Sequence, residues 1–236
     1  MIKEAINRIL ELAAIQKLTF GGRDYTSKAL MPVHDPSPVQ LGIDTLTGLI
    51  YYLDADIDLL GPPAGLMIHV VDFQTVRLLS ALDGIWATRK HYIEASAAPL
   101  KFNFDNFYNV ESFNIALQSM FVQDESTEAI LKIVGNLKDG TVNTFSDDGV
   151  SQTVNAKSGV SRVVEMPVPN PVTLRPYRTF MEIEQPASKF VFRMRSGAES
   201  PTCALFEADG GRWKNDAAFA IKEWLTGKVK GIPIIA

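Results

Sequence analysis

The side chains that could carry chemistry are few in this sequence and lie far apart along it. The three histidines do not fall at the spacing of a zinc site, and the single cysteine is distant from them. They are His34, His69, His91 and Cys203. The sequence contains neither a phosphate-binding P-loop nor a nucleophile elbow. We therefore predict no catalytic residue, no metal ligand and no cofactor, and the sequence favours a protein that is not an enzyme.

Acidic residues near turns allow two interpretations. Asp147 and Asp148, together with Glu207 and Asp209, would form a carboxylate metal site if the fold brought them together. Both pairs, however, lie beside glycines in turn-type sequences, where acids commonly stabilise the turn itself. The pattern favours turn acids.

Arginines and aromatic residues interleave between Pro167 and Arg195, which raises the question of nucleic-acid binding. Arginines could contact phosphates, and Phe180 and Phe190 could stack on bases. The alternative is an ordinary half-buried sheet with Phe190, Phe192 and Met194 in the core and the arginines paired with glutamates. The strict alternation favours the sheet. The candidate nucleic-acid contacts are Arg175, Tyr177, Arg178, Arg193 and Arg195.

The composition describes a globular protein without a global attraction for nucleic acid. The chain has 236 residues, of which 46% are hydrophobic, and 23 Lys and Arg face 27 Asp and Glu for a net charge of -4. Nucleic-acid binding would therefore need a local basic patch. One cysteine permits no internal disulfide and fits a reducing compartment, so we predict a cytoplasmic protein. No apolar run approaches the ~20 residues of a membrane span, so no membrane partner is predicted.

Strand patterns dominate the segment from Val172 to Arg195. Alternation predicts strands at 172–175, 178–184 and 189–195, and the short loop at 185–188 predicts an antiparallel pairing of the last two. Glu182 and Glu184 would then lie near Arg193 and Arg195.

The rest of the chain mixes helical and extended patterns. Helical spacing predicts helices over 2–13, 39–54, 111–122, 124–139 and 215–225, and extended patterns predict strands within 66–82, 88–95, 160–168 and 201–208. A hairpin is predicted over 141–154 with its turn at Ser146–Gly149. These patterns are segregated, which predicts an α+β fold: a mixed, mainly antiparallel sheet with flanking helices. We expect an N-terminal helical extension (1–16), a single α+β domain (17–226) and an apolar C-terminal tail (227–236).

Both ends of the chain carry apolar residues that need cover. The first helix has an isoleucine stripe, and the tail either folds back or adds to a neighbouring subunit, of which we favour the neighbour. The predicted intersubunit contacts are Ile2, Ile6, Ile9, Ile232, Ile234 and Ile235.

Three blocks of the sequence together resemble the YfdQ-like proteins of tailed phages and prophages. The blocks are Ser146–Val154, Asn170–Pro186 and Leu205–Trp213, and the resemblance covers at least the C-terminal half. It implies a phage or prophage origin and expression in the host cytoplasm. The activity of that family is uncharacterised, so no site residue is carried over from it.

Three functions remain in competition at this point. The first is a non-enzymatic protein that assembles with itself into a homo-oligomer, for example a ring or shell, and we favour it. The second is a nucleic-acid-binding accessory of phage replication or recombination. The third is a small ligand-binding or anti-defence protein with sites built from turn acids.

Overall fold

Two units make up the chain. The computed structural model describes residues 2–26, 37–82, 87–138, 145–147, 152–158, 162–168, 170–195 and 201–236. The small unit runs from Met1 to Ser37 and the large unit from Pro38 to Ala236. The small unit therefore contains the predicted extension 1–16 and the segment that follows it.

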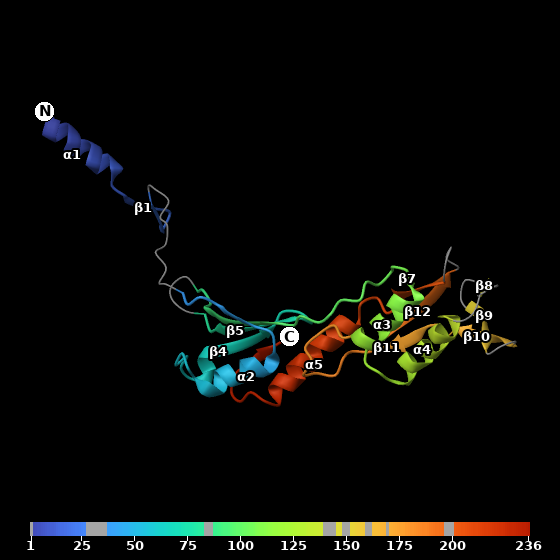
Figure 1. The fold of residues 1–236 in the computed structure, drawn as a ribbon. Helices are drawn as coiled ribbons and strands as arrows, with labels where there is room; N and C mark the ends of the chain where they lie inside the picture. Colours follow the sequence, from blue (N-terminus) through green and yellow to red (C-terminus); the bar gives the residue numbers. More distant parts are fainter. Residues whose placement is uncertain are drawn as a thin grey trace. The chain divides into compact units, whose positions relative to one another are not determined.

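The described part of the small unit contains a helix and a hairpin (Figure 1). Helix α1 spans Ile2–Ala13, as the spacing of its isoleucines predicts. Strands β1 (Lys17–Phe20) and β2 (Arg23–Thr26) pair antiparallel. Gly21 and Gly22 make the turn between them with φ of +60° and +74°, a conformation that glycine adopts without steric cost.

A mixed sheet forms one half of the large unit. Its strands in spatial order are β14 (Ile234–Ile235), β4 (Leu66–Val70), β5 (Thr75–Ser80), β6 (His91–Ser96) and β3 (Leu41–Ile43). The three central strands are antiparallel, and both edge strands run parallel to their neighbours. The extended pattern predicted within 66–82 is confirmed as two strands, β4 and β5, and the turn between them is held by Asp72 Oδ1, which accepts from Gln74 N at 2.7 Å.

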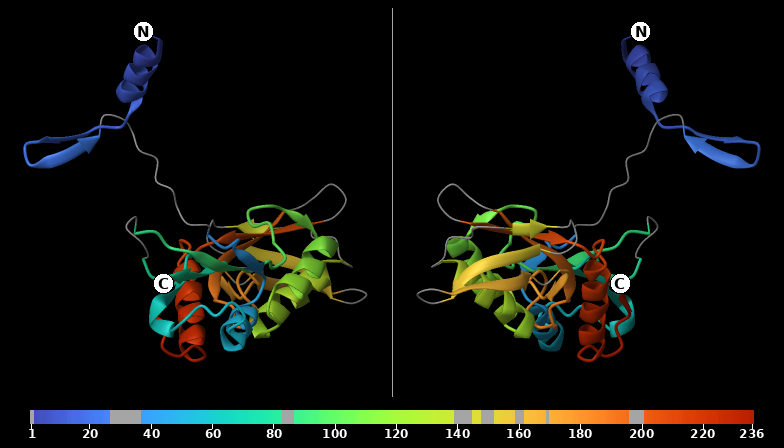
Figure 2. Two further views of the ribbon diagram at one scale, coloured as in Figure 1. Left: turned by 90° about the vertical axis from the view of Figure 1, so that its left-hand side faces the viewer. Right: turned by 90° about the vertical axis from the view of Figure 1, so that its right-hand side faces the viewer.

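Helices α2 (Leu46–Ala55) and α5 (Trp213–Thr226) pack on this sheet, and they lie next to each other in Figures 1 and 2. Thr45 caps α2, since its Oγ1 accepts from Gly48 N at 3.1 Å. The helix starts later than predicted because residues 41–43 form β3. The fully buried side chains of this first core include Leu46, Leu49, Ile68, Leu78, Ile93, Ile221 and Leu225.

An antiparallel sheet and a helical pair form the other half of the large unit. Its strands in order are β11 (Val172–Leu174), β12 (Ser188–Arg195), β13 (Thr202–Glu207) and β7 (Tyr108–Asn109). The predicted helices at 111–122 and 124–139 are confirmed as α3 (Val110–Met120) and α4 (Glu125–Lys138). The predicted core face of β12 is also confirmed. The second core includes Phe113, Leu117, Phe121, Phe190, Phe192, Met194 and Leu205.

A third sheet contains the predicted hairpin. Strands β8 (Phe145–Asp147), β9 (Gln152–Ser158) and β10 (Arg162–Val168) are antiparallel, with Phe145 opposite Val154. The antiparallel pairing is as predicted. Ser146 and Asp147, which were predicted to begin the turn, instead belong to β8, and this corrects the predicted turn. Residues 141–144 and 148–151 lie outside the described residues. The fold is therefore α+β, mostly antiparallel with one mixed sheet. Within the described ranges, no helix is long and apolar enough to cross a membrane.

The segment 178–184 is not a strand, and this corrects the prediction. β12 already pairs with β11 on one side and with β13 on the other, so no edge of β12 is left for it. The Gln185 side chain holds the segment as a loop. Its Oε1 accepts from Arg178 N at 2.9 Å and Thr179 N at 3.3 Å, and its Nε2 donates to Phe180 O at 3.0 Å.

This loop also joins the two halves of the large unit. Glu182 Oε1 accepts from Thr47 N at 2.9 Å, near the start of α2. Gln74 Nε2 donates to Arg178 O at 3.0 Å. Glu182 therefore serves α2 and does not pair with the arginines of β12 as predicted.

Replacing Gln185 by alanine should lower the free energy of unfolding by about 2–4 kcal/mol. Gln185 is buried, and the change leaves the N–H groups of Arg178 and Thr179 without acceptors, at about 1–3 kcal/mol each. Guanidinium unfolding measures the effect. The control is Gln118→Ala on the exposed side of α3, expected within about 0.5 kcal/mol of the parent. Equal losses in the two variants would contradict the role of Gln185.

Candidate functional site

The apolar stripe of α1 is the most exposed hydrophobic feature of the small unit. Ile2, Ile6, Ile9 and Leu10 are 78%, 51%, 65% and 63% exposed. They recur at helical spacing and so lie on one face of α1. We call these four residues the α1 stripe.

The small unit has no core of its own among its described side chains. None of its side chains that the structure describes is buried, and Ile15, Leu18 and Tyr25 are exposed in addition to the stripe. A helix shorter than about 12–15 residues is marginal in water by itself, and so is an isolated two-stranded hairpin.

The polar residues of α1 carry balanced charge. Lys3 and Arg8 are offset by Glu4 and Glu11, and Arg8 Nη1 lies 3.0 Å from Glu11 Oε2. A helix that binds an anionic membrane surface or a nucleic acid usually carries more basic than acidic residues. The described part of α1 carries equal numbers of basic and acidic residues and so has no basic excess.

The tail folds back on its own chain. Ile234 pairs with Ile68 and Ile235 with His69 in the parallel β14–β4 ladder, and Ile68 N donates to Pro233 O at 2.9 Å. The sequence analysis favours pairing of the tail with a neighbouring subunit. In the structure Ile234 and Ile235 pair with β4 of their own chain instead. Ile232 and Ile234 pack against the first core, and Ile235 remains 47% exposed.

Arg175, the first candidate nucleic-acid contact, is held by two carboxylates. Its Nη2 lies 3.2 Å from Asp124 Oδ2, and its Nη1 lies 2.7 Å from Glu184 Oε1. Asp124 Oδ1 also accepts from Thr127 N at 3.0 Å in the first turn of α4. Burial raises the pKa of Asp124, but the hydrogen bonds from Thr127 and Arg175 outweigh burial and lower that pKa below its usual value. Arg175 thus has a structural role.

Replacing Asp124 by alanine should destabilise the protein by about 1–2 kcal/mol at neutral pH, because α4 loses its cap. The folded-state pKa of Asp124 is lowered, so its contribution is complete above the ordinary Asp pKa of about 3.9 and is lost as the pH falls through the folded value. The difference between the two proteins should therefore shrink below about pH 4. Unfolding curves at several pH values measure it. Glu125→Ala is the control, and a pH-independent difference for Asp124→Ala would contradict the assignment.

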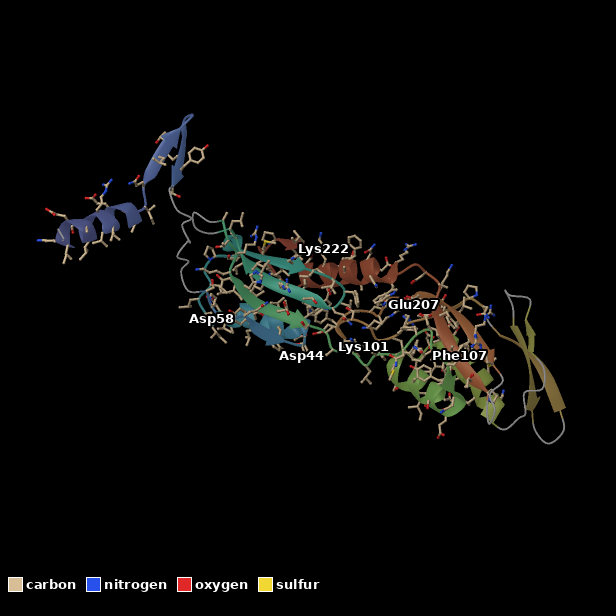
Figure 3. The ribbon with its side chains drawn as sticks, turned by 90° about the horizontal axis from the view of Figure 1, so that it is seen from above. Asp44, Asp58, Lys101, Phe107, Glu207 and Lys222 are labelled. Atoms are coloured by element: carbon tan, nitrogen blue, oxygen red, sulfur yellow. The ribbon has the colours of Figure 1, made fainter. Side chains whose placement is uncertain are left out.

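Arg178, the second candidate, lies at the centre of a buried cluster. Its Nη1 bonds Glu207 Oε1 at 2.5 Å and its Nη2 bonds Ser188 Oγ at 2.6 Å. The guanidinium carbon lies 3.9 Å from the centre of the Trp213 ring. Burial lowers the pKa of Arg178 to about 10, which Glu207 partly offsets, so the side chain is charged at neutral pH. We call Arg178, Ser188, Glu207 and Trp213 the Arg178 cluster, and Figure 3 labels Glu207 in it.

The other candidates do not join this cluster. Tyr177 is half-buried and its N–H donates to Met120 O at 2.9 Å. Arg193 and Arg195 lie two residues apart on β12, and the Arg195 guanidinium lies 4.1 Å from the centre of the Phe107 ring, which Figure 3 labels. The stacking residues suggested by the sequence, Phe180 and Phe190, are buried in the two cores and cannot receive bases. This corrects that part of the nucleic-acid hypothesis.

The acidic and thiol groups have ordinary structural surroundings. Asp209 Oδ1 accepts from Gly211 N at 3.0 Å in a turn, and Glu207 pairs with Arg178, so neither is part of a described acidic site. Asp148 lies outside the described residues. No group of three or more His, Cys, Asp or Glu in the described ranges could hold a metal ion. Cys203 is fully buried, and burial raises the pKa of its thiol to about 12.

Sequence reasoning singled out Arg178 as a candidate but did not connect it with the other three residues of the Arg178 cluster. Its members come from four different segments, namely the loop at 178–184, β12, β13 and α5, and no spacing rule connects Ser188, Glu207 and Trp213 to Arg178. The only local signal was that a tryptophan, an acid and an arginine lie within the blocks of the family resemblance.

Comparison with known proteins adds no relative. The chain matches no protein-family model, no curated protein and no solved structure. The resemblance to the YfdQ-like proteins therefore stays a prediction.

Proposed function

We propose that this protein is a non-enzymatic subunit that assembles with copies of itself through the α1 stripe. The observation that carries the proposal is the exposure of Ile2, Ile6, Ile9 and Leu10 in a unit where none of the described side chains is buried. Each copy of the chain would supply the apolar surface that the small unit lacks. The balanced charge of α1 supports a second copy as the occupant of the stripe.

The predicted phage or prophage origin fits such a role. A homo-oligomer in the host cytoplasm, for example a ring or shell, needs no catalytic centre. The nucleic-acid alternative has less support, because Arg175 and Arg178 pair with carboxylates and the two phenylalanines offered for stacking are buried.

Cysteine cross-linking tests the proposal on the full chain. Ile6 and Ile9 lie near the middle of α1, so a parallel helix pair brings Ile9 to Ile9 and an antiparallel pair brings Ile6 to Ile9. Ile9→Cys alone, or Ile6→Cys mixed with Ile9→Cys, should therefore form a covalent dimer of twice 26.0 kDa on mild oxidation. The native Cys203 does not compete, because it is buried with a raised pKa.

Glu4→Cys is the matched control, since Glu4 lies about 160° around α1 from Ile2 and from Ile6. It should cross-link much less than the two stripe variants. The proposal fails if neither the single nor the mixed stripe variants cross-link, or if Glu4→Cys cross-links as well as they do.

A further inference from the structure

The β1–β2 hairpin of the small unit has one polar face and one apolar face. In its ladder Leu18 lies opposite Tyr25, and Thr19 lies opposite Asp24. Directly opposite residues of an antiparallel pair point to the same face, and neighbours along a strand point to opposite faces. Leu18 and Tyr25 therefore share one face of the hairpin, and Thr19 and Asp24 share the other.

The polar face makes its hydrogen bonds within the hairpin. Thr19 Oγ1 donates to Asp24 Oδ1 at 2.8 Å, and Lys17 Nζ lies 2.7 Å from Asp24 Oδ2. The hydrogen bonds from Lys17 and then from Thr19 lower the pKa of Asp24 below its usual value. This face is therefore suited to contact with water.

The apolar face has no cover in the described part of the small unit. Leu18 is 54% exposed and Tyr25 is 50% exposed. Ile15, which lies between α1 and β1 in the chain, is 53% exposed. Figure 2 shows the hairpin extending away from α1, in agreement with the exposure of both elements. We call Ile15, Leu18 and Tyr25 the hairpin patch.

The area of the α1 stripe is small for a stable dimer. At roughly 200 Å² for a fully exposed residue of this size, its four residues offer about 500 Å² on each copy. Two copies would bury about 1,000 Å² in total, whereas specific interfaces bury about 1,200–2,000 Å². Adding the hairpin patch of each copy raises the total to roughly 1,600 Å², which is the size of a standard interface.

We propose that the hairpin patch docks on the hairpin patch of a second copy, an inference that rests on the proposed assembly through α1. The two apolar faces pack against each other as the inner faces of two small sheets, about 10 Å apart. The contact is isologous, because the same patch serves on both copies, and a closed dimer therefore covers both patches. The polar faces, with Thr19 and Asp24, point outward to solvent.

Alkylation of an introduced cysteine tests this contact on the full chain. In the assembled protein, Leu18→Cys should react with iodoacetamide at least tenfold more slowly than Thr19→Cys, the matched control on the polar face. In chains that also carry Ile6→Asp and Ile9→Asp, and are therefore monomeric, the two cysteines should react at similar rates. The native Cys203 does not compete, because it is buried and the pKa of its thiol is raised to about 12.

A second variant measures what the patch contributes to assembly. Leu18→Thr/Tyr25→Thr keeps residues that favour strands but removes the apolar face of the hairpin. The dissociation constant, measured by light scattering on dilution, should rise at least tenfold. Thr19→Ser on the polar face is the control, and its dissociation constant should equal that of the parent.

The outcomes separate this contact from the assembly through α1. A parent chain that is monomeric at every concentration contradicts both. If the parent assembles but Leu18→Cys reacts as fast as Thr19→Cys, the hairpin contact alone is overturned. Slow alkylation of Leu18→Cys in the monomeric chain also overturns it, because the patch is then covered by its own chain.

Discussion

The double variant Ile6→Asp/Ile9→Asp should be a monomer of 26.0 kDa at concentrations where the parent chain is assembled. Both side chains are more than half exposed in the small unit, and covering each contributes about 1 kcal/mol or more. Two such residues on each of two copies contribute about 4 kcal/mol, which corresponds to roughly a thousandfold change in the dissociation constant. The new carboxylates would also repel each other across the pair.

Arg8→Asp separates this effect from a general effect of acid in α1. It changes the net charge by as much as the two new carboxylates do, but Arg8 lies about 160° around the helix from Ile6 and its pair with Glu11 is exposed, so the assembly should persist. Circular dichroism of both variants checks that the large unit is intact. If the Ile6→Asp/Ile9→Asp variant still assembles, the α1 stripe is not part of the interface.

The second large effect is expected at the Arg178 cluster. Glu207→Ala should lower the free energy of unfolding by about 3 kcal/mol, because Arg178 is buried and would lose its counter-charge. This loss of stability is at the low end of the range for breaking a buried ion pair, because the Glu207 side chain is 33% exposed. Guanidinium unfolding measures this loss of stability in a chain that also carries Ile6→Asp and Ile9→Asp, so that assembly does not contribute to the measured value.

A compensating variant distinguishes an unpaired charge from simple loss of packing. Arg178→Met/Glu207→Leu removes both charges and should be at least 1 kcal/mol more stable than Glu207→Ala, as when buried ion pairs are replaced by apolar residues. Asp216→Ala breaks the exposed pair with Arg212, 3.8 Å apart, and should change stability by less than about 0.5 kcal/mol. A double variant less stable than Glu207→Ala would contradict the electrostatic explanation.

Local patterns in the sequence were sufficient for most helices and for the core face of β12. The isoleucine spacing of α1 and the alternation of Phe190, Phe192 and Met194 each depend on one element alone. The loop at 178–184 could not be predicted in this way. Its residues alternate as in a strand, but both edges of β12 are occupied by strands from elsewhere in the chain, and the buried Gln185 binds the loop backbone instead.

The candidate sites show the same division. The α1 stripe is visible in the sequence because it is one helical face. The burial of Arg178 is not, because Ser188, Glu207 and Trp213 reach it only after the antiparallel sheet and α5 have formed. An arginine among aromatic residues has the same local sequence whether it faces solvent or a cavity, and only the pairing of distant strands decides between the two.

The solution mass of the purified parent chain, measured by light scattering from low to high micromolar concentration, tests self-assembly most directly. The account predicts a discrete multiple of 26.0 kDa, with ultraviolet absorbance free of nucleic acid, that falls to 26.0 kDa in Ile6→Asp/Ile9→Asp. A parent chain that remains at 26.0 kDa over the whole range would contradict it.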